Sequence, residues 1–145
     1  MQAPPLEDEQ REVAASVQWI LTGDAGLRML AAWSYGWSAA QAASGTDWMA
    51  PYLGRLLDDP YYVVRFNAAR SLGAIGGYGG VLKGYDHLSE AALATSFVDS
   101  VRAVWQARYT GGARARLLMG ARGLDLARFQ KLYARRDDRM AFIHE

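Results

Sequence analysis

The chain has 145 residues, of which 51% are hydrophobic and 21% are charged, a composition that fits one folded domain and excludes a disordered chain. Cysteine is absent, which excludes disulfides, thiol catalysis and covalent haem attachment within this sequence. The net charge of +1 combines −3 in residues 1–80 (5 Lys/Arg, 8 Asp/Glu) with +4 in residues 81–145 (11 and 7). So mild a division favours a solvated dipolar surface over nucleic-acid binding.

Apolar residues recur at helical spacing through the first half of the chain. After an extended lead-in over residues 1–6, the pattern predicts helices over about 7–21 and 25–37, the second one capped by Asp24. A connector follows, with a short helical turn over 38–43, and Thr46 or Asp47 then caps a third helix that reaches Leu57. We expect the second helix to bury Leu27, Leu30, Ala31 and Tyr35.

The second half of the chain begins at a sharp turn. Asp59 is placed to cap a fourth helix that ends at Ile75, with Pro60 at its first position. A glycine-rich connector over 77–88 leads to a helical extension over 89–136, with helices over 90–109, capped by Ser89, and 124–135. Residues 137–145 are expected to form an extended tail. No segment alternates as a strand does, so the predicted fold class is all-α, with five to six helices in one domain.

A block of sequence repeats at an offset of 37 residues. DAGLRMLAAWSYGW, from residue 24, aligns with YYVVRFNAARSLGA, from residue 61. A repeat of this length predicts a short α-solenoid, in which each helical unit buries its apolar face on the next. The identical pairs are Arg28/Arg65, Ala31/Ala68, Ala32/Ala69, Ser34/Ser71 and Gly36/Gly73.

The stretch LLDDPYYVVRFNAARSLGAIG resembles the second half of a HEAT repeat, a family with an Asp-Pro turn between two antiparallel helices. The matching residues are Asp59, Pro60, Val64, Arg65, Ala68 and Ala69. The resemblance covers residues 7–76, where the first unit is a divergent copy with Gly23-Asp24 in place of Asp-Pro. It implies a HEAT-like α-α superhelix that acts as a scaffold or accessory subunit.

WILTGDAGLRMLAAWSYGW and the closing RRDDR also resemble the C-terminal HEAT-type region of large bacterial multihaem c-type cytochromes with tetratricopeptide repeats. The CxxCH haem motif of those proteins is missing here. The resemblance therefore implies a docking module without a cofactor, and a partner subunit for which a multihaem cytochrome is one candidate. The expected compartment is the cytoplasm if Met1 is the native start, and the periplasm or extracellular space if the chain is a processed fragment. No stretch approaches the roughly 18 apolar residues of a membrane span.

Two sets of residues are candidates for function or for stitching the repeats together. Aromatic and arginine side chains dominate binding energy at interfaces, so a stripe of such residues on the second helices of the two units predicts a partner-binding surface; the alternative is that the rings pack on neighbouring helices. The turn acids and the repeated arginines predict a structural ladder between units. The stripe comprises Met29, Trp33, Trp37, Phe66 and Arg70, and the ladder Asp24, Arg28, Asp59 and Arg65.

Other constellations point to rival functions. The glycine run from Gly76 to Gly84 does not fit a phosphate loop, and His87 and His144 lack further ligands for a metal. A HEAT-like lyase-type enzyme would need a buried acid, for which Asp47 and Asp86 are the candidates. A nucleic-acid-binding HEAT-like protein would need its basic residues on one face. We expect a non-catalytic protein-interaction module; the C-terminal basic residues are Arg114, Arg116, Arg122, Arg128, Lys131, Arg135, Arg136 and Arg139.

Overall fold

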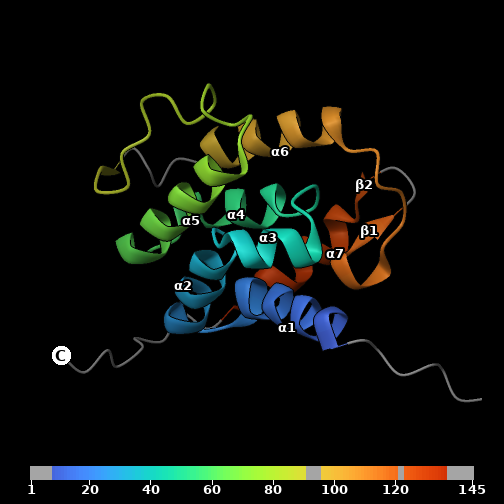
Figure 1. Ribbon diagram of the computed structural model, residues 1–145. Helices are drawn as coiled ribbons and strands as arrows, with labels where there is room; N and C mark the ends of the chain where they lie inside the picture. Colours follow the sequence, from blue (N-terminus) through green and yellow to red (C-terminus); the bar gives the residue numbers. More distant parts are fainter. Residues whose placement is uncertain (1–7, 91–95, 121–122, 137–145) are drawn as a thin grey trace, which may run out of the picture.

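The computed structural model describes residues 8–90, 96–120 and 123–136, and these residues are mostly helical, as predicted. Figure 1 shows the helices gathered around one core. The α-helices are α1 (Asp8–Thr22), α2 (Ala25–Ser34), α3 (Ser38–Ser44), α4 (Ala50–Arg55), α5 (Tyr62–Ile75), α6 (Ser96–Arg108) and α7 (Leu126–Tyr133). Short 3-10 helices span Leu56–Asp58 and Ala115–Leu117, and β1 (Met119–Gly120) pairs with β2 (Gly123–Leu124).

The second helix ends earlier than predicted. α2 stops at Ser34, and Trp37 has extended backbone angles (φ −77°, ψ 133°) as the residue that precedes α3. The chain turns here where α5 comes close: a Cβ on Gly36 would lie 2.7 Å from Oγ of Ser71. The expected helical turn after Trp37 is thus a separate helix, and the described residues form seven α-helices in place of the expected five to six.

The buried face of α2 also differs from the prediction. Ala31 and Tyr35 are buried as expected, but Leu30 is exposed and Leu27 is half-buried. Arg28, which lies one turn before Ala31 on the same side of the helix, is fully buried. The prediction assigned the face by hydrophobicity, whereas a paired arginine can take a core position that leucine would otherwise fill.

The turn acids have different roles. As predicted, Asp24 caps α2, its Oδ1 accepting a hydrogen bond of 2.9 Å from the Leu27 amide. The prediction for Asp59 and Pro60 is wrong: α5 begins two residues after Pro60, and the carboxylate of Asp59 binds Arg28. The third helix likewise begins later than expected, after Met49 and without a side-chain cap.

The C-terminal third contains a short pair of strands that the sequence did not predict. The segment before α7 was expected to lack strands, but β1 and β2 form an antiparallel pair with Met119 opposite Leu124. A positive φ of 114° at Gly123 allows the chain to enter β2. α7 therefore starts at Leu126, capped by Asp125, and not at Leu124. The predicted lead-in, the predicted tail and the first turns of the fifth helix lie outside the described residues.

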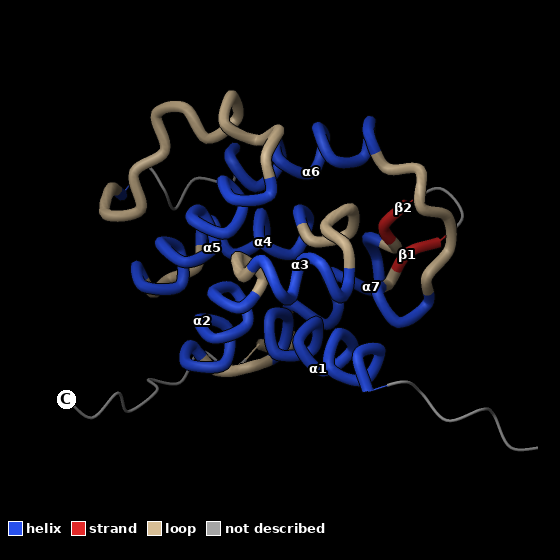
Figure 2. The backbone as a smooth tube through the Cα atoms, viewed as in Figure 1, coloured by secondary structure: helices blue, strands red, loops and turns tan. Residues whose placement is uncertain are grey.

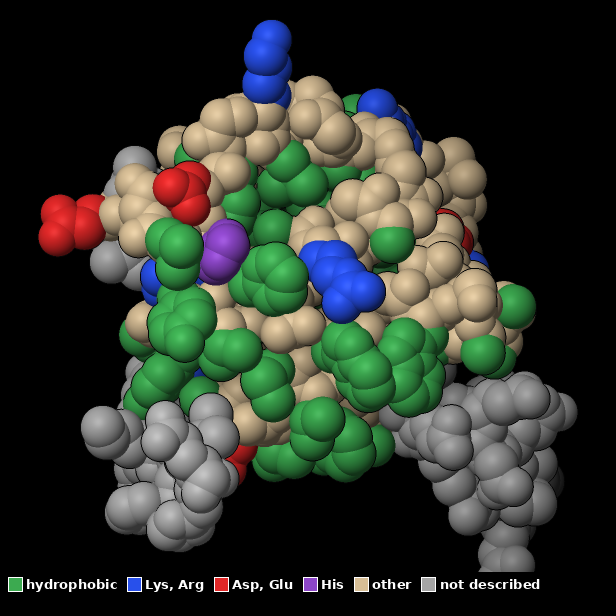
Figure 3. Space-filling view, turned by 60° about the vertical axis from the view of Figure 1, so that its left-hand side comes forward, with side chains coloured by type: hydrophobic (Ala, Val, Ile, Leu, Met, Phe, Trp, Pro, Cys, Tyr) green, Lys and Arg blue, Asp and Glu red, His purple; other side chains and the backbone are tan. Residues whose placement is uncertain are grey.

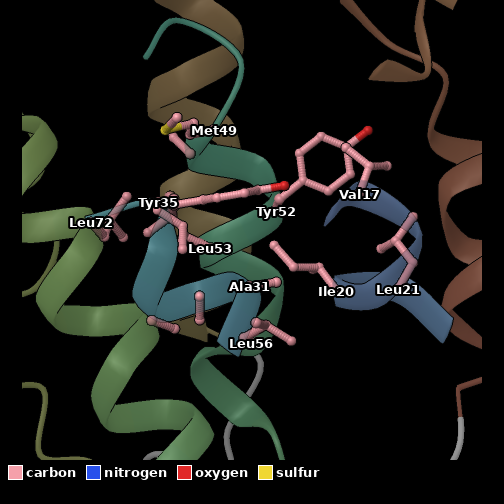
Figure 4. Packing of buried hydrophobic residues seen from close by; sticks show 14 of the residues in the cluster. Val17, Ile20, Leu21, Ala31, Tyr35, Met49, Tyr52, Leu53, Leu56 and Leu72 are labelled. Atoms are coloured by element: carbon pink, nitrogen blue, oxygen red, sulfur yellow. The ribbon is translucent and has the colours of Figure 1, made fainter. Parts of the chain in front are cut away.

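The helices pack in two rows. α2 lies on α5, while α1, α4 and α6 follow one another in the second row, and α7 returns to α1. Figure 2 shows the long connection between α5 and α6, residues 76–90, running along one end of the molecule. Figure 4 shows Val17 and Ile20 of α1 facing Tyr52 of α4 across the core. All three side chains are buried.

A chain of aromatic rings connects the C-terminal end of α2 with α7. Tyr35 meets Trp48 edge-on with ring centroids 5.1 Å apart, and Trp48 meets Tyr52 at 5.9 Å. Tyr52 in turn lies 5.3 Å from Phe129 of α7, and its hydroxyl donates to the carbonyl of Leu117. Edge-on ring pairs add to the free energy of burial. The C-terminal extension is therefore part of the same core as the repeat units.

Candidate functional site

α2 and α5 lie side by side and run in the same direction. Oγ of Ser71 on α5 donates a hydrogen bond to the carbonyl of Ala32 on α2, and Asn67 lies one turn earlier, beside Leu30. Leu30 and Asn67 are separated by 37 residues, which is the offset of the sequence repeat. The repeat thus corresponds to the spatial register of two neighbouring helices, and equivalent positions of the two units stand next to each other.

The outer surface of these helices carries large apolar side chains. Their exposed fractions range from 40% for Trp33 to 61% for Tyr62, which is unusual for rings of this size. We call this surface the α2/α5 face. Figure 3 shows hydrophobic side chains gathered on this side of the molecule, around a basic side chain. The face comprises Leu30, Trp33, Trp37, Tyr62, Phe66 and Arg70.

A groove crosses the boundary between the two helices. It has a volume of about 320 Å³ and is lined by Met29, Leu30 and Trp33 from α2 and by Asn67 from α5. Trp37 stands edge-on to Trp33, with ring centroids 4.3 Å apart, so the second indole packs against a residue that lines the groove. An apolar groove with a polar amide in its floor can accept one large side chain of a partner.

The two helices of this face contribute only positive charge to it. Neither α2 nor α5 contains an aspartate or glutamate, and Arg70 is exposed one turn beyond Phe66. Of the acids near these helices, Asp24 caps α2 and Asp59 is buried with Arg28, while Asp86 is exposed on the connector beside His87, which stacks on Phe66. The face therefore suits an apolar partner segment that also carries a carboxylate.

The predicted stripe residues all belong to α2, α5 and the turn after α2. Trp33, Trp37, Phe66 and Arg70 are exposed, and Met29 is half-buried in the groove. Trp33 and Trp37 are in contact but not on one helix, since α2 ends between them. The exposed positions thus include the places where the two units differ, Trp33 against Arg70 above all.

The ladder residues form a connected group below this face. The Arg28 guanidinium binds the Asp59 carboxylate, and Nη1 of Arg65 donates to the backbone carbonyl of Asp59 at 2.6 Å. Nε of Arg65 donates to the carbonyl of His87 at 2.8 Å. Asp24 is not part of this group, because its carboxylate caps α2. Arg28 therefore links the first unit to the turn of the second.

Sequence reasoning missed two residues of the face. Tyr62 lies four residues before Phe66 and eight before Arg70, so the helical spacing of these three positions was a usable signal. Leu30 was assigned to the core, because its neighbour Arg28 was not recognised as the buried residue. Because Arg28 faces the core, the helix is oriented so that Leu30 faces the solvent.

The residues proposed for rival functions are dispersed. Asp47 is half-exposed and paired with Arg114, with 3.0 Å between Oδ1 and Nη1, while Asp86 is exposed on the connector. His87 stacks obliquely on Phe66 at 5.0 Å. In the part of the chain that the structure describes, no group of three or more His, Cys, Asp or Glu could hold a metal ion. His144, Arg122 and Arg139 lie outside the described residues.

The glycine-rich connector packs against the start of α5 and the turn before it. The hydroxyl of Tyr85 donates to the carbonyl of Leu57 at 2.6 Å, and its ring meets Phe97 of α6 at 5.0 Å. Together with the bond from Arg65 to His87, these contacts fix the connector on the molecule. Its glycines serve turns, with positive φ at Gly76 and Gly84.

The remaining basic residues do not converge on the α2/α5 face. Arg65 is buried under the connector, so it cannot extend the positive charge of Arg70. Arg128, Lys131 and Arg135 line a separate groove of about 500 Å³ on α7. The arrangement that a basic concave surface for nucleic acid would need is not formed by these residues.

No family model, curated protein or solved structure matches this chain. Within the described ranges, none of the helices combines the length and the apolar character needed to cross a bilayer.

Proposed function

We propose that this chain is a non-catalytic protein-interaction module that binds a segment of another protein on the α2/α5 face. The observation that carries the proposal is the exposure of five large apolar side chains beside Arg70, on α2, α5 and the turn after α2, where the two helices contain no carboxylate. Exposed apolar patches on folded domains mark interaction sites more often than chance. Aromatic and arginine side chains are the residues that dominate binding energy at such sites.

The arrangement of the helices supports the same proposal. The second helices of the two units, α2 and α5, lie side by side, and their equivalent positions are 37 residues apart. A short α-solenoid requires this arrangement of paired helices. In a solenoid the second helices form the continuous binding surface. A scaffold of this kind acts by holding side chains in fixed positions, so that little conformational entropy is lost on binding. The sequence resemblance suggests that this chain is an accessory subunit whose partner is another protein subunit, with a multihaem cytochrome as one candidate.

The α2/α5 face is supported by close packing between the two helices. Behind the exposed rings, α2 and α5 bury Ala31, Ala32, Ala68 and Leu72, which allow the helices to approach closely. The hydrogen bond from Ser71 to Ala32 fixes their relative height. A partner would therefore meet a preformed groove rather than one that must assemble on binding.

Selection of displayed peptides against the full chain tests the proposal. We expect selected peptides to combine a large apolar residue with an acidic residue, and their binding to weaken at least tenfold in Trp33→Ala or Arg70→Glu, a loss of about 1.4 kcal/mol. Trp19→Ala is the matched control, because this α1 indole is as exposed (44%) but does not line the groove. Equal losses in Trp33→Ala and Trp19→Ala, or peptides without an acidic residue, would overturn the proposal.

A further inference from the structure

The exposed side chains of the α2/α5 face form two rows, one on each helix. On α5, Tyr62, Phe66 and Arg70 follow one another at four-residue intervals, which is about 6 Å per step along a helix. On α2, Leu30 and Trp33 lie one turn apart. The groove lies where the two helices meet, and the helices run in the same direction. Rows of this spacing on parallel helices can interdigitate with the side chains of a third helix.

The groove offers few polar groups to the backbone of a bound segment. The backbone N–H and C=O groups of α2 and α5 are bonded within their own helices. In the groove, Nδ2 of Asn67 donates to the carbonyl of Val63 at 2.8 Å, and nearby the hydroxyl of Ser71 donates to the carbonyl of Ala32. An extended segment would bury backbone groups here without partners, which is costly. A helical segment avoids this cost, because it bonds its own backbone groups internally.

We propose that the segment bound by the α2/α5 face is an amphipathic α-helix of another protein, with a carboxylate placed against Arg70. The inference rests on the proposed function and specifies the form of its ligand. α2 has 10 residues and α5 has 14, which correspond to about 15 Å and 21 Å. A partner helix of about 12 residues, or about 18 Å, covers both rows. Its apolar residues at i, i+4 and i+7 face the groove, as in other helices that bind in grooves.

The charges around the face determine where the carboxylate belongs. Arg70 lies one turn beyond Phe66, and its equivalent 37 residues earlier is Trp33. The connector carries the exposed Asp86 next to His87, whose ring is 5.0 Å from that of Phe66. The connector thus brings negative charge near Phe66, while Arg70 brings positive charge one turn further along α5. The partner's carboxylate is therefore favoured at the Arg70 end of the groove.

A second copy of this chain matches the face less well than a partner of different sequence. In a twofold dimer the same surface of each copy would meet its counterpart. The Arg70 side chains of both copies would then enter the contact, and neither α2 nor α5 supplies a carboxylate to pair with them. A different protein can supply both the apolar residues and the acid.

Two displayed libraries of peptides of about 14 residues test the helical form against the full chain. Both libraries vary the same positions; one has an alanine-rich background that permits a helix, and the other carries a central proline that breaks it. We expect binders from the helical library, with an aspartate or glutamate next to the apolar positions. Introducing the central proline into the best helical binder should weaken its binding at least tenfold.

A charge reversal tests the place of the carboxylate. Arg70→Glu should weaken the best helical binder at least tenfold, and replacing the acid of that binder by arginine should restore most of the lost affinity. Lys131→Glu is the matched control, because it makes the same change of charge at an exposed position of α7. An equal loss in Lys131→Glu, or no restoration by the reversed binder, overturns the contact with Arg70.

The outcomes separate this inference from the proposed function. If binders come from the proline library and lose affinity in Trp33→Ala, the helical form is wrong and the proposed function stands. Helical binders that keep their affinity in Trp33→Ala bind elsewhere, and they overturn both, as does the absence of binders from either library. Sedimentation of the chain alone gives the remaining outcome: a dimer that dissociates in Trp33→Ala would mean that a second copy occupies the face, and it would overturn the inference.

Discussion

Arg28 and Asp59 form an ion pair that solvent does not reach. Nε of Arg28 lies 2.7 Å from Oδ2 of Asp59, both side chains are 0% exposed, and Nη2 donates to Oδ1 at 3.2 Å. The third guanidinium nitrogen, Nη1, donates to the carbonyl of Gly23 at 2.8 Å. One arginine thus joins the turn between α1 and α2 to the turn that leads into α5.

Removal of one partner should destabilise the fold strongly. Arg28→Met keeps the volume and leaves the carboxylate of Asp59 buried without its cation. We expect the free energy of unfolding to fall by about 3–5 kcal/mol, because an unpaired buried charge is costly. Chemical denaturation followed by circular dichroism measures the change.

A double substitution measures the coupling between Arg28 and Asp59. Arg28→Met combined with Asp59→Leu removes both charges, and we expect it to recover most of the stability that Arg28→Met loses. Some loss will remain, because Asp59 also accepts a hydrogen bond of 3.1 Å from the Tyr61 amide. If the stability loss of the double variant equals the sum of the losses in Arg28→Met and Asp59→Leu alone, the prediction of strong coupling between these residues is wrong.

Two helical glycines should respond to alanine in opposite directions. A Cβ on Gly54 would lie 2.7 Å from Cγ1 of Val101, so Gly54→Ala forces α4 and α6 apart. Overpacking costs about 1–3 kcal/mol, more than the helix propensity that alanine gains. A Cβ on Gly73 meets no atom within 4 Å, so Gly73→Ala should stabilise the protein by about 0.5–1 kcal/mol. Thermal unfolding of both variants checks the two signs, and a stabilising Gly54→Ala would contradict the close packing.

The sequence could predict those parts of the fold that depend on local chemistry. Helical spacing located α1 and α5 to within a few residues, and the cap at Asp24 followed from its position before an apolar run. The end of α2 could not be predicted in this way. It depends on Ser71, which is distant in sequence and comes close to Gly36 only in the folded chain.

The candidate face was predictable only in part, for a similar reason. The repeat offset placed Trp33 and Arg70 at equivalent positions, and both are exposed on neighbouring helices. Leu30 could not be assigned to the surface, because its exposure follows from the burial of Arg28. That burial requires Asp59, 31 residues away; the repeat identified both residues as members of the ladder, but it did not show that their pair would be buried.

The surface pair of Asp47 and Arg114 should contribute little to stability. Its two hydrogen bonds of 3.0 Å are well formed, but the side chains are 48% and 37% exposed. Exposed ion pairs contribute about 0.2–1 kcal/mol, and salt screens them. We expect Arg114→Ala to lower the free energy of unfolding by less than about 1 kcal/mol, with the difference shrinking as salt is added. A loss comparable to that of Arg28→Met would show that the pair holds the β1–β2 region in place.

The stability of the protein should decrease above pH 10, because buried tyrosines resist ionisation. Burial raises the pKa of Tyr85 to about 12, and burial raises the pKa of Tyr35 and Tyr52 further. A pKa raised in the folded state contributes stability that is complete below the unfolded value of 10 and is lost as the pH rises through the folded value. For Tyr85 this window runs from about pH 10 to pH 12. Denaturant unfolding across the window should show falling stability. Tyrosinate absorbance of the folded protein should appear at a higher pH than that of the unfolded chain.

Tyr85→Phe provides the control for this alkaline effect. The variant loses the hydrogen bond to the carbonyl of Leu57 and should be less stable than the native chain at neutral pH. Because it has no phenol to ionise at this position, its stability should fall less steeply between pH 10 and pH 12. The two stability curves should therefore converge as the pH rises. Parallel curves would mean that Tyr85 ionises in the folded protein as easily as in the unfolded one, and that its contact with α6 does not exclude water.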